Sequence, residues 1–97
     1  MYIIAKRFNP FTKKYSVAKR KLATIASTGK IEEKDGNLVL VWNWQCKIGR
    51  NDLSVWPIDS YGISDAEANR RVANIKHDFK ADGYEYQPAL DYENRNS

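Results

Sequence analysis

One stretch near the C-terminal end, residues 64–83, carries a full set of local helix signals and therefore constrains the fold more than any other. Ser64 is a favourable N-cap, and Glu67 three residues later completes a capping box that satisfies backbone N–H groups at a helix start. Gly83 suits the position just beyond a helix C-terminus. Apolar residues between them recur at helical spacing along one stripe, namely Ala68, Val72, Ile75 and Phe79. The sequence predicts a helix at 65–82 with one buried face.

A second stretch, residues 38–47, alternates in the way a half-buried strand does. One of its faces is apolar throughout and consists of Leu38, Leu40, Trp42, Trp44 and Cys46. Asp35-Gly36 just upstream is a favoured two-residue hairpin turn, so residues 31–34 are expected to pair back onto this strand. Farther along, residues 53–58 are expected to form a third strand, and Pro57 indicates that it ends at a sheet edge.

The N-terminal part of the chain is less determined. Residues 2–8 read as a strand, which Asn9-Pro10 breaks. The apolar positions of residues 13–27 follow a helical stripe with Thr12 as N-cap, and this helix is the preferred interpretation. The same residues also fit a hairpin strand with Tyr15 and Val17 on one face, and the sequence does not decide between the two structures.

The predicted fold class is α+β, since one helix is expected to cover one face of a small antiparallel sheet. We expect three to five strands packed against the helix at 65–82, with the second helix at 13–27 as described above. Residues 84–86 read as a short last strand. A single compact domain is expected over residues 1–87, and a frayed C-terminal tail over 88–97.

Apolar runs and cysteine usage bear on where the protein works. The longest apolar run, residues 38–42, is far shorter than the ~20 residues of a membrane span. The first residues lack the pattern of a secretory signal. Cys46 is the only cysteine and His77 the only histidine, so neither an internal disulfide nor a four-ligand zinc site is expected. We expect a cytoplasmic (intracellular) protein with no membrane contact, no metal and no cofactor.

Charge is distributed unevenly along the chain. Residues 1–31 carry eight lysines or arginines and no acid, whereas residues 32–97 carry eight cations and all twelve acids, a net charge of −4. Such asymmetry indicates a basic surface that faces a polyanion, because phosphates bind clustered cations through counterion release. The predicted nucleic-acid or polyanion-binding residues are Lys6, Arg7, Lys13, Lys14, Lys19, Arg20 and Lys21.

A secondary surface is predicted on the outer side of the helix. It consists of Arg70, Asn74, His77 and Lys80, together with Trp56 from the third strand. Trp56 is the tryptophan expected to be partly exposed, because it falls on the opposite strand face from Leu53 and Val55. Trp42 and Trp44 are interpreted as core residues.

No catalytic residue is predicted. His77 is expected to be solvated on the outer helix face, and Cys46 to be a buried, unreactive thiol. Glu32 and Glu33 are neighbours on a strand and point to opposite faces, so they are interpreted as hairpin surface near lysines.

Three classes of function remain, in order of preference. The first is a small non-enzymatic binding protein that contacts nucleic acid through its basic N-terminal surface. The second is a protein-binding inhibitor or accessory protein of phage or mobile-element type, which docks on an acidic patch or blocks a host defence complex. The third is a small toxin-like ribonuclease, for which His77 lacks a partner at useful spacing. An exposed strand edge also leaves homodimerisation open.

Overall fold

The computed structural model of the chain describes residues 1–88, so the predicted tail lies, apart from Pro88, outside the described residues. The elements follow one another as β1 (Tyr2–Asn9), β2 (Lys14–Lys21), the 3-10 helix η1 (Leu22–Ser27), β3 (Gly29–Lys34), β4 (Asn37–Trp42), β5 (Lys47–Ile48), β6 (Asn51–Asp52), β7 (Val55–Ile63), α1 (Asp65–Ala81) and β8 (Glu85–Tyr86). Within residues 1–88, no helix is long and apolar enough to cross a membrane.

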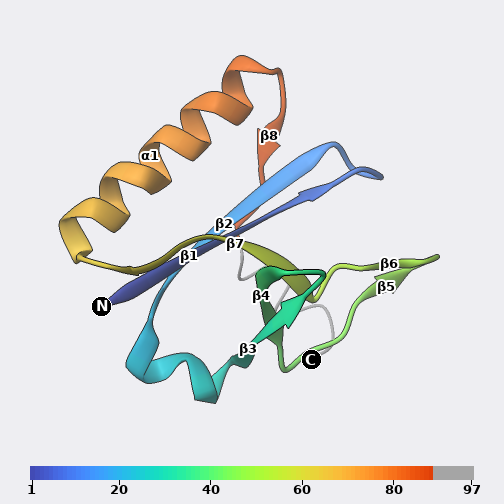
Figure 1. The fold of residues 1–97 in the computed structure, drawn as a ribbon. Helices are drawn as coiled ribbons and strands as arrows, with labels where there is room; N and C mark the ends of the chain where they lie inside the picture. The colour runs from blue at the N-terminus through green and yellow to red at the C-terminus, as the bar shows by residue number, and fades with distance from the viewer. Residues whose placement is uncertain (89–97) are drawn as a thin grey trace.

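Six of these strands form one curled sheet in the order β3-β4-β7-β1-β2-β8, and β5 and β6 form a separate small hairpin. All pairs in the sheet are antiparallel except β2 with β8, which is parallel. Helix α1 lies over the β1–β2 end of the sheet (Figure 1). The predicted α+β class is therefore confirmed, although the sheet has more strands than the three to five expected.

Helix α1 begins and ends where the sequence predicts. The Ser64 hydroxyl accepts a hydrogen bond from the Glu67 N–H at 3.2 Å, which satisfies one of the unpaired donors of the first turn. At the other end, the Gly83 N–H donates to the Lys80 carbonyl and the Tyr84 N–H to the Phe79 carbonyl, both at 3.0 Å. This pair of bonds is a Schellman motif, which turns the chain back toward β8.

The predicted hairpin at Asp35-Gly36 is present. Both turn residues have positive φ, 53° and 81°, as a two-residue turn that matches strand twist requires. The partner strand β4 is shorter than the predicted strand at 38–47, because it ends at Trp42 and the following residues lead into the β5–β6 hairpin.

The preferred helix at 13–27 is wrong, and the hairpin alternative is right for its first half. Residues 14–21 form β2, which pairs with β1 over its whole length, and residues 22–27 form η1. Tyr15 and Val17 belong to the core beneath α1, whereas Ala18 belongs to the core on the other side of the sheet. Two-sided burial of consecutive residues requires a strand, and it overrides the helical spacing of the apolar residues.

The prediction that Pro57 marks a sheet edge is also wrong, because β7 lies inside the sheet between β4 and β1. Proline is tolerated there because β7 changes partners along its length. Its pairing with β4 uses residues 55–57, and its pairing with β1 ends at Ile58. No β1 residue is thus paired with Pro57, which lacks the N–H that such a pair would need.

The sheet separates two apolar cores. The core on the side away from α1 contains Ile3, Ala5, Ala18, Ile25, Leu40, Trp42, Leu53 and Trp56, and the core beneath α1 contains Ile4, Tyr15, Val17, Ala68 and Ile75. Trp56 is fully buried, so its expected partial exposure is wrong. Its indole N–H donates to the Leu53 carbonyl at 2.7 Å. This hydrogen bond offsets the free-energy cost of removing the indole N–H from water.

Replacement of Gly29 tests the close approach of β3 to β4. A Cβ at this residue would lie 2.4 Å from the Val41 carbonyl oxygen, so G29A must push the two strands apart. We expect the free energy of unfolding, measured by urea denaturation, to fall by about 1–3 kcal/mol. Lys30 is an exposed residue of the same strand, so K30A should change the free energy of unfolding by less than ~0.5 kcal/mol. Equal stability of G29A and wild type would contradict the packing of this strand pair.

Candidate nucleic-acid interface

The seven predicted polyanion-binding cations all lie on the β1–β2 hairpin, but they do not share one face. Strand pairing places one group on the α1 side, which consists of Lys6, Lys19 and Lys21. A second group lies on the opposite side and consists of Arg7, Lys14 and Arg20. Lys13 belongs to the turn, where its φ is 59°. The alternation of side chains along paired strands thus divides a charge cluster that is continuous in sequence.

Two of the cations on the α1 side are held by acidic partners. The Lys19 ammonium lies 2.8 Å from both the Asp65 carboxylate and the Asn69 amide oxygen, and 4.9 Å from the centre of the Tyr2 ring. The hydrogen bond from Lys19 lowers the pKa of Asp65. Lys6 lies 3.4 Å from the Asp59 carboxylate. These lysines stabilise the junction between the hairpin, β7 and α1.

The arginines on the opposite side of the hairpin make backbone contacts. Arg7 Nη1 donates to the Val55 carbonyl at 3.2 Å, just beyond the point where the pairing of β1 with β7 ends. Arg20 Nη1 donates to the Lys19 carbonyl at 3.1 Å, and its guanidinium lies 5.2 Å from the centre of the Trp42 ring. Arg7 and Arg20 therefore have structural roles in addition to their charge.

The tip of the hairpin, residues 10–14, differs from its base. In Figure 1 the turn of the β1–β2 hairpin extends beyond α1, whereas Lys14 at the start of β2 still pairs with β8. Phe11 is 55% exposed, and Lys13 is exposed beside it. Within residues 1–88, no acidic group forms an ion pair with Lys13 or Lys14. Among the described residues, the tip thus has an exposed aromatic ring followed by two lysines that form no ion pair, of which Lys14 is half-buried and lies beside Glu85 of β8.

Asn9 fixes the shape of this tip from below. It is only 1% exposed, and its side-chain oxygen accepts hydrogen bonds from the N–H groups of Phe11 (2.9 Å) and Thr12 (3.4 Å). Its backbone carbonyl accepts a bond from the Lys13 N–H at 2.9 Å. Asparagine is typical of such turns because its short side chain can replace a backbone acceptor.

The predicted secondary surface is only partly assembled. Arg70, Asn74, His77 and Lys80 are exposed on the outer face of α1. Trp56 cannot belong to this surface, because it is buried in the core on the other side of the sheet. The His77 side chain is 83% exposed and lies 3.7 Å from the Asp78 carboxylate. Within residues 1–88, no three His, Cys, Asp or Glu side chains lie close enough together to hold a metal ion.

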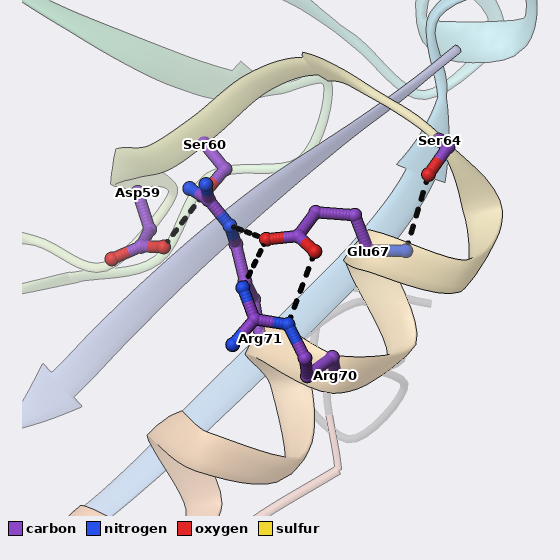
Figure 2. Close-up of polar contacts among 6 residues, drawn as sticks. All are labelled: Asp59, Ser60, Ser64, Glu67, Arg70 and Arg71. Carbon is purple, nitrogen blue, oxygen red and sulfur yellow. Dashed lines mark hydrogen bonds and ion pairs between the residues drawn. The ribbon is translucent and has the colours of Figure 1, made fainter.

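Arg70 also takes part in a group of polar contacts that joins α1 to β7 (Figure 2). The Glu67 carboxylate accepts a bond from Arg70 Nε at 3.0 Å and one from Arg71 Nε at 2.8 Å. Arg71 Nη1 reaches the Ser60 hydroxyl at 2.6 Å, and this hydroxyl donates to the Asp59 carboxylate at 2.9 Å. The helical spacing of Glu67, Arg70 and Arg71 could have indicated the first part, but no sequence signal pointed to β7.

Comparison with known proteins adds no family to these observations. No protein-family model, curated protein or solved structure matches the chain. Any functional conclusion therefore depends on the geometry of the chain itself.

Acid titration tests the contacts of Glu67. The hydrogen bonds from Arg70 and Arg71 lower the pKa of Glu67 from 4.5 to about 2. Because the pKa of Glu67 is lower in the folded state, its ionised carboxylate stabilises the fold fully above pH 4.5. This stabilisation is lost as the pH falls toward 2. We expect E67Q to be less stable than wild type at about pH 7 and to approach it at about pH 2.5, in urea denaturation at low salt. If the free energies of unfolding of the two proteins differ by the same amount at both pH values, the lowered pKa of Glu67 is contradicted.

Proposed function

We propose that this protein is a non-enzymatic nucleic-acid-binding protein whose principal contact is the tip of the β1–β2 hairpin. The observation that carries the proposal is a protruding turn on which exposed Phe11 is followed by Lys13 and Lys14, neither of which forms an ion pair within residues 1–88. The other cations of the hairpin add to the positive field around it, but several of them are engaged in contacts with β7 and α1.

The chemistry of the tip suits a nucleic acid in two respects. Lysine ammonium groups bind phosphates as point charges, with an affinity that depends strongly on salt. An exposed aromatic ring can stack on an unpaired base, and a two-stranded ribbon is narrow enough to enter the major groove of a duplex. Because both contacts are largely independent of base identity, the proposed binding has little sequence preference.

The acid-free N-terminal segment supports the same proposal. Exposed ion pairs such as Lys6 with Asp59 are weak and screened by salt, so the paired lysines still contribute to the long-range field. A field of this kind concentrates a polyanion near the hairpin and accelerates its encounter with the tip.

Charge reversal at the tip tests the proposal. We expect K13E/K14E to weaken binding of labelled single-stranded DNA, duplex DNA and RNA in fluorescence anisotropy titrations at ~50 mM and ~200 mM salt. Loss of two phosphate contacts should also reduce the slope of log affinity against log salt by about 2 for the duplex.

The matched control places the same charge change on the β5–β6 hairpin. Lys47 and Arg50 are both exposed at the β5–β6 hairpin, so K47E/R50E changes the net charge equally. An equal loss of affinity in both double variants would reject the tip as the contact. If wild type binds none of the three nucleic acids at low salt, the proposal is wrong, and an acidic protein partner would be sought by pull-down.

The ring of Phe11 has its own test. Base–aromatic stacking contributes about 1–3 kcal/mol per base, so F11A should weaken binding of single strands by roughly 5- to 150-fold. Binding of duplex DNA, whose bases are already stacked, should change much less. The same titrations measure both, and an equal effect on single strands and duplex would show that the ring does not stack on bases.

A further inference from the structure

Strand β3 forms one edge of the six-stranded sheet, and within residues 1–88 no strand pairs with its outer side. Its pairing with β4 determines which backbone groups point outward. The Lys34↔Asn37 pair closes the two-residue turn, and the Asn43 N–H donates to the Thr28 carbonyl at 2.8 Å. Hydrogen-bonded pairs of an antiparallel ladder occur at every second residue, so the even-numbered residues of β3 bond to β4. The N–H and C=O groups of Gly29, Ile31 and Glu33 therefore point away from the sheet.

The side chains along this edge alternate in charge on one face. Lys30 and Glu32 lie on the same side of β3, with their charged atoms 2.8 Å apart and side-chain exposures of 68% and 36%. Ile31 between them points to the opposite face, where it packs against the core that contains Trp56. Lys30 and Glu32 thus lie equally spaced about Ile31, and Lys34 follows on the same face of the strand.

We propose that this edge binds a second copy of the same strand, antiparallel to the first, with Ile31 opposite Ile31 across a two-fold axis. In this register, Lys30 of each chain lies opposite Glu32 of the other. In this register, the outward-facing groups of Ile31 in the two chains form one hydrogen-bonded pair. Glu33 of each chain lies opposite Gly29 of the other, and these two outer pairs require Gly29, which is buried in the single chain, to become accessible. Lys30 and Glu32 occupy the pairs between them, where side chains approach most closely.

The charges select this register from its alternatives. A shift by two residues is the smallest that keeps the outward backbone groups facing each other and leaves each face continuous across the junction. A shift in one direction places Glu32 opposite Glu32 and Lys30 opposite Lys34. A shift in the other direction places Lys30 opposite Lys30. Like charges directly opposite are destabilising, so both shifts are disfavoured.

The pattern is consistent with a weak, specific association. Charged residues on an edge strand normally prevent pairing with other chains, and here they do so in the two registers next to the self-complementary one. The ladder is short, so the interface falls below the size of a stable complex and the dimer should form reversibly with a dissociation constant above ~1 µM. Formation of this dimer is independent of the nucleic-acid contact proposed above, because it uses the opposite end of the sheet from the β1–β2 hairpin.

Sedimentation velocity without nucleic acid tests the proposal. Over protein concentrations from about 5 µM to about 1 mM, wild type should shift from monomer to dimer. K30E and E32K should each remain monomeric, because like charges then lie opposite each other. The double swap K30E/E32K should restore the dimer, and a mixture of the two single variants should form a heterodimer, since one chain then carries two anions and the other two cations.

These variants distinguish the register from a loss of folding. Lys30 is exposed and Glu32 is partly exposed, so circular dichroism and thermal unfolding of the single variants should stay close to wild type. Monomeric wild type at the highest concentration would overturn the proposal, as would single variants that dimerise like wild type or a double swap that fails to restore the dimer.

Amide hydrogen exchange adds a readout at the level of single residues. The N–H groups of Ile31 and Glu33 should become protected as the protein concentration rises, whereas those of Glu32 and Lys34, which bond to β4, should be protected at every concentration. Concentration-dependent protection elsewhere in the chain, without protection of Ile31, would also overturn the proposal.

Discussion

Burial of β1 on both of its faces is the constraint on which the rest of the structure depends. Ile3 and Ala5 enter one core, and Ile4 enters the other, each without measurable exposure. A strand buried in this way needs a neighbour on each side, which β2 and β7 provide, and a cover on each face. The helix supplies one cover and the curled β3–β4–β7 part of the sheet supplies the other. Charged residues can enter β1 only where this double burial ends, after Ala5.

The same constraint explains how the positive charge of the hairpin is distributed. Away from the tip, Lys6 and Lys19 form ion pairs with Asp59 and Asp65, and Arg7 and Arg20 donate hydrogen bonds to backbone carbonyls. Toward the tip, Lys13 lies in the turn outside the sheet, and Lys14 pairs with Glu85 of β8 but forms no ion pair within residues 1–88. The cations of the acid-free segment thus contact other elements near the base of the hairpin and lack such contacts near its tip.

Local signals identified the elements whose conformation is decided locally. The cap at Ser64, the stop at Gly83 and the turn at Asp35-Gly36 are all present, because each depends on backbone groups within a few residues. The helix predicted at 13–27 is wrong, because the burial of these residues depends on α1, which is far away in sequence. The partial exposure predicted for Trp56 is wrong, because its burial depends on Ile3 and Ala5 of β1 and on Leu40 of β4. The tip cations could be predicted as basic, but their separation from the others follows only from the strand register.

The buried Asn9 has a consequence for how the tip can recognise a partner. Fixing the backbone of one residue costs roughly 1–2 kcal/mol in conformational entropy, and Asn9 restrains the Phe11 and Thr12 positions as the protein folds. A partner that binds the tip therefore meets a turn whose backbone already has a defined shape. Binding then has to order only the side chains of the turn. Lysine side chains remain flexible on such a turn, so they can follow phosphates of differing spacing while the backbone beneath them keeps one conformation.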